Sequence, residues 1–213
     1  MKKYILVLLT VFCVYGEMLH AQAIGTQLSY IQPTGMYGYV FNPTASAEIN
    51  YQLGDIEERL KMSFAIGYYA LTTTRDTFFT VGIQSGGSGT KALEGYNVWK
   101  NVWVVPLGVN IDYKIMDENF SPTVGGDVYF LMMDMIYIHD LSGVIHSETN
   151  GGKGAMAVVP RVGMSYEAGN VLLLGGVGYS MGIDEEYGMQ TYLKSYLKVC
   201  YYFDSSGGNR RRR

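Results

Sequence analysis

Two histidines, a serine and a glutamate lie close together in the second half of the chain, and these residue types could carry out hydrolysis. They are His139, His146, Ser147 and Glu148. A serine hydrolase needs a histidine that is hydrogen-bonded to its serine and acts as a general base. His146 and Ser147 are adjacent in sequence, and adjacent residues of a strand point to opposite faces. We therefore interpret residues 140–153 as a solvated loop and predict no enzymatic activity.

The other motifs give no reason to expect a metal ion or a cofactor. His20 falls in the N-terminal segment, and the two remaining histidines lack the spacing of metal ligands. The glycine-rich segment 86–91 lacks the Gly-Lys-Ser/Thr ending of a phosphate-binding loop. The net charge is −3, so there is no basic excess to indicate nucleic-acid binding. We predict that the protein binds neither a cofactor nor nucleic acid.

Charged residues in the middle of otherwise apolar segments form a second set of interest. Each of them alternates with apolar neighbours, and a period of two places successive side chains on opposite faces of a strand. Six of these residues lie on the polar faces of their segments: Glu48, Asp112, Asp127, Arg161, Lys194 and Lys198. What these charges can do depends on the strands that carry them.

Period-two alternation predicts eight strands. In the last of them Leu197, Val199 and Tyr201 alternate with Lys198 and Cys200. The eight strands span about residues 24–32, 44–53, 59–71, 102–116, 123–139, 154–167, 171–182 and 191–203. Segment 75–83 is a further candidate, which we interpret as an extension of the third strand or as a hairpin within a long loop. The 19 tyrosines, 27 glycines and 16% charged residues fit a β-rich wall.

The connections between these strands alternate in length. The short connections are residues 54–58, 117–122 and 168–170. The longer ones are residues 33–43, 72–101, 140–153 and 183–190. Outer-membrane barrels have short periplasmic turns and longer external loops. We therefore predict an all-β fold, an eight-stranded antiparallel up-and-down transmembrane β-barrel with both mature termini in the periplasm.

Two features of the strands predict that their apolar faces point outward to lipid. The polar faces carry charges in mid-strand, and on the lipid face each Arg or Lys would cost roughly 2–4 kcal/mol at the midplane. Aromatic residues mark both ends of the apolar bands, as in interfacial girdles. They are Tyr51, Tyr113, Tyr166, Tyr201 and Phe203 on the turn side, and Tyr68, Trp103 and Tyr179 on the loop side. The six charged residues would then pair inside the narrow barrel and plug it.

The two ends of the chain predict export and a basic tail. Lys2 and Lys3 precede an apolar run, and small residues follow at Ala21 and Ala23, so residues 1–22 are expected to be a cleaved signal peptide. Residues 23–203 would form the barrel, with Cys200 as the only cysteine and hence no intrachain disulfide. Residues 204–213 are expected to be a disordered tail that ends in four arginines.

Two segments carry a likeness to a known family. Residues 104–113 (VVPLGVNIDY) and 120–126 (FSPTVGG) are similar to a descending strand, turn and ascending strand of that family, and residues 158–166 repeat the first of these. The chain resembles the generic outer-membrane β-barrel family common in Bacteroidetes over most of residues 24–203. The last strand ends in Phe203, similar to the terminal aromatic residue that the barrel-assembly machinery reads, although a tail follows it here. The resemblance implies a small barrel in a Gram-negative outer membrane and almost no specific activity.

These expectations lead to one preferred function and three alternatives. We expect an integral outer-membrane protein with a structural or surface-interaction role and a plugged interior. Its partners would be outer-membrane lipid, the barrel-assembly machinery, and an envelope protein bound through loop 72–101 or through the run from Arg210 to Arg213. The alternatives are a narrow channel, a lipid-modifying outer-membrane enzyme, and a soluble lipocalin-like binder whose apolar faces would point inward.

Overall fold

The computed structural model describes residues 23–35, 37–52, 59–75, 77–86, 89–100, 102–142, 145–183 and 191–203. The described residues form these elements: β1 (Ala23–Pro33), α2 (Tyr37–Val40), β2 (Thr44–Gln52), β3 (Leu60–Leu71), β4 (Thr77–Gly86), β5 (Gly89–Trp99), β6 (Val102–Lys114), β7 (Phe120–Leu141), β8 (Ile145–Ala168), β9 (Val171–Ile183) and β10 (Tyr192–Tyr202). The expected signal peptide (1–22) and basic tail (204–213) lie outside the described residues.

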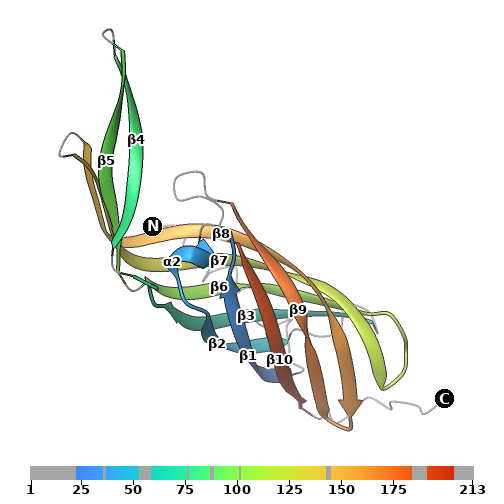
Figure 1. Cartoon of the computed structure of the whole chain (residues 1–213). Helices are drawn as coiled ribbons and strands as arrows, with labels where there is room; N and C mark the ends of the chain where they lie inside the picture. Colours follow the sequence, from blue (N-terminus) through green and yellow to red (C-terminus); the bar gives the residue numbers. More distant parts are fainter. Residues whose placement is uncertain are drawn as a thin grey trace.

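Eight of the strands close into a barrel. The order β7-β6-β3-β2-β1-β10-β9-β8 is hydrogen-bonded throughout, and an additional β7–β8 pairing joins the two ends of this series. Every pairing is antiparallel, for example β3 with β6 and β8 with β9. The predicted eight-stranded up-and-down barrel is confirmed, and Figure 1 shows its strands inclined around a common axis.

The first and last strands of the barrel pair with each other along their full length. Their register runs from Ala23↔Tyr202 to Pro33↔Tyr192. Both ends of the barrel sequence therefore lie at the same end of the molecule, as an even number of up-and-down strands requires. The turns 115–119 and 169–170 lie at that same end, because they join strands whose partners end there.

An extension of the same sheet protrudes from the other end of the barrel. β4 and β5 form a hairpin within the long connection 72–101, which is one of the two interpretations offered for segment 75–83. β5 also pairs with the C-terminal residues of β7, from Gly95↔Leu141 to Trp99↔Tyr137. We call β4, β5 and the paired ends of β7 (134–141) and β8 (145–155) the protruding sheet, which rises well beyond the barrel in Figure 1.

The prediction of a solvated loop at residues 140–153 was wrong. β7 continues to Leu141 and β8 begins at Ile145, and the two pair from Phe120↔Tyr166 to Leu141↔Ile145. Only residues 142–144 separate the strands. Above the barrel most of the described side chains of this ribbon are exposed or half-buried on both faces. The alternation that marks the other strands therefore disappears, and polar residues there resemble a loop.

Burial alternates with a period of two along the barrel strands. β1 and β10 alternate buried and exposed residues without a break. The exposed residues are the apolar ones, such as Leu28, Ile49 and Leu197, and the buried ones include most of the charged residues. The apolar faces thus point outward, opposite to the arrangement in a soluble lipocalin-like barrel. Among the described residues, no helix is long and apolar enough to cross a membrane.

Candidate functional site

The barrel interior is the candidate site, because the predicted charged residues converge there. All six lie buried on inward faces of β2, β6, β7, β8 and β10: Glu48, Asp112, Asp127, Arg161, Lys194 and Lys198. Their ion pairs join them into one continuous series that crosses the barrel. With three acidic and three basic members, the series carries no formal net charge. We call it the central ion chain.

Arg161 on β8 bridges two carboxylates. Its Nη2 lies 2.8 Å from Asp112 Oδ1, to which it donates a hydrogen bond, and 2.8 Å from Asp127 Oδ1, where the contact is an ion pair without hydrogen-bond geometry. The guanidinium also lies 4.9 Å from the ring centroid of Tyr196, a cation–π distance. Gly176 makes room for this ring, because a Cβ there would lie 2.8 Å from the Tyr196 hydroxyl.

Lys194 on β10 connects the other half of the chain. Its Nζ donates to Glu48 Oε1 at 2.6 Å and to the Tyr129 hydroxyl at 3.0 Å, and lies 3.6 Å from Asp127 Oδ2. Tyr129 in turn donates to Glu48 Oε2 at 2.8 Å. At the far end Lys198 Nζ lies 3.7 Å from Asp112 Oδ2. Each buried charge therefore has an opposite charge nearby, which is what a buried ion needs to remain charged.

A second charged layer fills the end of the barrel near the chain termini, and the sequence analysis did not assign it a role. Glu167 on β8 pairs with both Lys61 and Lys114, the latter at 3.1 Å. Lys61 also donates to the Tyr202 hydroxyl at 2.7 Å. These residues lie on the polar faces of β3, β6 and β8, so the alternation that identified the six applies to them as well. They lie near the strand ends, where a charged residue is equally typical of a turn, so the sequence did not single them out.

The turns at this end are joined by an exposed ion pair. Arg59 precedes β3 and donates two hydrogen bonds to the Asp117 carboxylate in the turn 115–119. The hydrogen bonds from Arg59 hold the pKa of Asp117 below its ordinary value. Both side chains are largely exposed, so this pair contributes little to stability.

The opposite end of the interior is apolar rather than charged. Ile31, Leu71, Val102, Val104 and Leu131 are buried there in one cluster. The connection after β1 folds into this mouth, held by hydrogen bonds from Asn42 N to Thr72 O at 2.8 Å and from Thr74 N to Val40 O at 2.7 Å. Val40 and Phe41 of this connection are buried in the same cluster, so the connection packs into the mouth.

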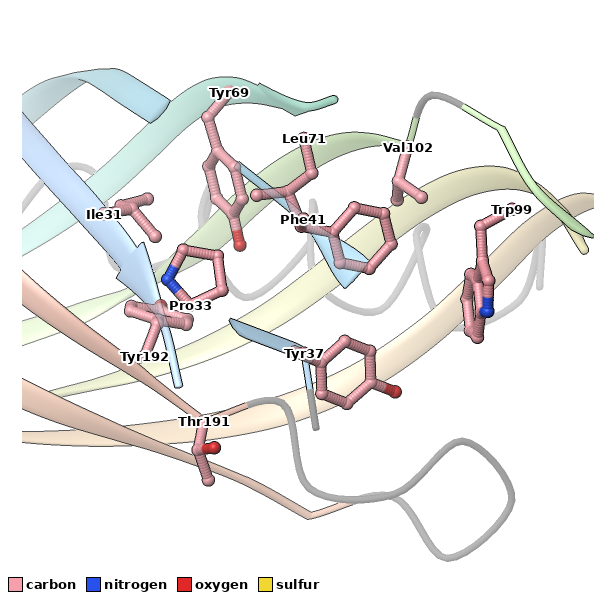
Figure 2. Close-up of a pocket in the computed structure, with 10 residues that line it drawn as sticks. All are labelled: Ile31, Pro33, Tyr37, Phe41, Tyr69, Leu71, Trp99, Val102, Thr191 and Tyr192. Atoms are coloured by element: carbon pink, nitrogen blue, oxygen red, sulfur yellow. The ribbon is translucent and has the colours of Figure 1, made fainter. Parts of the chain in front are cut away.

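Three aromatic rings from two connections meet at the mouth. Tyr37 stacks on Phe41 at 5.9 Å between centroids, and Trp99 at the end of β5 meets Phe41 edge-on at 5.6 Å. They border a small apolar pocket, and Figure 2 shows its side chains arranged around it, with Ile31 and Trp99 at opposite ends. Tyr69 and Tyr192 add two further aromatic rings to its lining. The rings therefore pack against one another at the mouth.

The hydrolase candidates lie on the protruding sheet rather than in the interior. His146 and Glu148 are exposed on β8, and His146 Nδ1 lies 3.1 Å from Asp140 Oδ2 on β7. His139 is hydrogen-bonded through Nδ1 to Asn97 Oδ1 on β5. In the strand register, position 147 lies opposite position 139 of β7, whereas His146 lies opposite Asp140. Within the described part of the chain, no group of three His, Cys, Asp or Glu residues could hold a metal ion.

The outer surface of the barrel carries an apolar band with aromatic residues at both ends. The eight girdle residues predicted from the sequence are all exposed: Tyr51, Tyr68, Trp103, Tyr113, Tyr166, Tyr179, Tyr201 and Phe203. Between them the exposed residues include Ile66, Leu107, Val128 and Val177. Tyr68 and Trp103 lie on adjacent strands with ring centroids 5.7 Å apart.

Comparison with solved structures identifies this architecture. Neisserial surface protein A has a TM-score of 0.53 at 13% sequence identity, over 87% of this chain and 99% of that one. The fold is that of a small outer-membrane β-barrel. Ail of Yersinia pestis (8% identity, TM-score 0.39, 84% and 94% coverage) and E. coli outer membrane protein W (12%, 0.38, 86% and 99%) are more distant matches. No protein-family model and no curated protein matches the sequence.

Proposed function

We propose that the chain is an integral outer-membrane protein with a sealed interior and a structural or surface-interaction role. One observation carries the proposal: the apolar side chains face outward in a band bordered by aromatic rings, while the charges pair inside. A closed barrel satisfies every backbone group of its wall, so it can enter lipid without an unpaired edge. The same surface in water would leave a continuous apolar belt exposed.

Differences between the two ends of the barrel support an orientation. The short turns and both ends of the barrel sequence lie together, and the protruding sheet lies at the other end. In outer-membrane barrels the short turns are periplasmic and the long connections external. We therefore place both mature termini in the periplasm and the protruding sheet outside the cell. A cleaved signal peptide over residues 1–22 remains part of the proposal.

A surface-interaction role fits the filled interior and the protruding hairpin better than transport or catalysis does. The interior contains an apolar layer, the central ion chain and the layer around Glu167. We infer that these layers leave no path for a solute through the barrel. The connection 72–101 instead forms a hairpin that reaches beyond the barrel. We propose that a partner at the cell surface binds this hairpin. Membership of the Bacteroidetes family and contacts of the arginine tail remain predictions.

Epitope accessibility tests this placement. A short epitope inserted between Gly86 and Gly89, at the tip of the β4–β5 hairpin, should bind antibody on intact cells. The same epitope at the C-terminus should bind only after the outer membrane is permeabilised. Antibody binding to the hairpin only after permeabilisation would contradict the orientation. Recovery of the protein in the soluble periplasmic fraction would contradict the membrane location itself.

A further inference from the structure

The protruding sheet ends in two strand edges. Its strand order is β4-β5-β7-β8, so β4 is the terminal strand on one side. On the other side β8 pairs with β9 only from Met156 onward, which leaves residues 145–155 as the second edge. A terminal strand presents unpaired backbone N–H and C=O groups along one side. Natural proteins normally protect such edges with charges, bends or irregular backbone.

The β8 edge is protected in this way. Glu148 and Lys153 put charges of both signs on it. Gly151 has a φ of 124°, a conformation that interrupts a regular strand. Three glycines between positions 151 and 154 further reduce its ability to pair. This edge is therefore a poor template for another strand.

The β4 edge has neither the charges nor the positive-φ glycine of the β8 edge, although it contains Gly82 and Gly86. Its ten residues, TFFTVGIQSG, include no charged residue and no proline, and they are rich in β-branched and aromatic types. Phe79 is 89% exposed and Val81 is 65% exposed on one face of the strand. Tyr96 of β5 lies directly opposite Phe79 in the register and is exposed as well. A long, uncharged, apolar edge in water favours addition of another strand.

The edge is also held in place by packing on its other face. Phe78 packs against the apolar cluster in the barrel mouth. Leu141 of β7 reaches across β5 to β4, because a Cβ at Gly82 would lie 2.7 Å from Leu141 Cδ1. Gly95 permits this, since a Cβ there would lie 2.8 Å from Leu141 Cα. A strand held on one face loses little conformational freedom when a partner pairs with its edge.

We propose that the β4 edge binds an extended segment of a partner protein, which adds to the sheet as a further strand. The inference rests on the proposed function, because it requires the protruding sheet to lie outside the membrane. Main-chain hydrogen bonds would supply most of the affinity, and alternate side chains the specificity. The segment we expect is uncharged, with β-branched or aromatic residues at every second position to lie beside Phe79 and Val81.

A defined peptide tests the proposal on the full-length protein in lipid nanodiscs. The probe is a fluorescently labelled ten-residue peptide of alternating threonine and valine with one central tyrosine. Fluorescence anisotropy should show saturable binding to the wild-type protein. Val81→Lys should weaken binding at least tenfold, because a lysine on an edge opposes pairing. Glu148→Lys, which changes the edge that is already charged, should leave the affinity within twofold.

Further outcomes separate the alternatives. A peptide with proline at its centre lacks a backbone donor and should not bind, and binding equal to that of the first peptide would overturn strand addition. No saturable binding to the wild type, or equal binding to empty nanodiscs, would also overturn it. Cross-linked dimers that Val81→Lys abolishes would make the occupant a second copy instead. Gel mobility of the same samples reports whether the barrel itself is formed, so failure of the proposed function is recognised separately.

Discussion

At the residue scale, the interior depends on charges that are almost fully buried and must therefore compensate one another. Arg161 contacts both Asp112 and Asp127, and Lys194 contacts both Glu48 and Asp127. Attraction between buried ions offsets the cost of removing them from water only when every member keeps its partner. Removal of one charged residue should therefore lower the free energy of unfolding by more than the intact ion pair contributes to it.

Replacement of Arg161 by methionine should destabilise the barrel strongly. It leaves Asp112 without its hydrogen-bonded cation and Asp127 with only Lys194. We expect a loss of about 3–5 kcal/mol in the free energy of unfolding, typical of a buried pair with one partner removed. Urea unfolding in lipid vesicles would measure it. Arg75→Met is the matched control, since Arg75 is exposed outside the strands and its loss should change stability by less than about 0.5 kcal/mol.

An equal effect of the two arginine substitutions would show that the interior charges do not stabilise one another.

The positions of the six charged residues could be predicted because each stands in mid-strand among apolar neighbours. Lys61, Lys114 and Glu167 follow the same alternation, but they lie near strand ends, where a charge is equally typical of a turn. Their meeting around Glu167 depends on strand pairing across the barrel, which alternation within one segment cannot reveal.

At the element scale, alternation predicted a strand wherever one face meets lipid and the other meets the interior. It located all eight barrel strands, most of them to within a few residues. It failed above the barrel, where β7 and β8 continue past His139 and Glu148 and most of the described side chains are exposed or half-buried on both faces. The pairing of β5 with β7 could not be predicted either, because it joins segments about forty residues apart.

The β4–β5 hairpin should be dispensable for formation of the barrel. β3 pairs directly with β6, from Leu60↔Tyr113 to Leu71↔Val102, so the ring closes without the hairpin. We expect a protein in which a flexible Gly/Ser linker replaces residues 77–98 to keep its heat-dependent gel mobility and membrane location. Trp99, which packs over the mouth, remains in this variant. A variant that fails to fold would show that the protruding sheet is part of the barrel's structural core.

At the scale of the whole molecule, side chains occupy the interior in three layers. An apolar cluster closes the mouth beneath the protruding sheet, the central ion chain fills the middle, and Lys61, Lys114 and Glu167 fill the other end. An eight-stranded barrel is just wide enough for its own side chains. Each charged group of the central ion chain has an oppositely charged partner inside the barrel.

Planar-bilayer recordings should therefore show no unitary conductance from the folded protein. The physical reason is that an ion crossing the barrel would have to separate the pairs around Arg161 and Lys194 in a low-dielectric interior. Protein boiled before reconstitution controls for leaks caused by detergent or aggregates. Reproducible current steps from the folded protein, absent from the boiled sample, would favour the narrow channel instead.

The orientation of the apolar faces is the central claim, and heat modifiability in the outer-membrane fraction tests it most directly. The envelope would be fractionated, and the gel mobility of unboiled protein compared with that of boiled protein. An apolar-out barrel should be found with the outer membrane and should migrate faster unboiled, because the closed barrel resists detergent. A soluble periplasmic protein whose mobility boiling does not change would contradict the account.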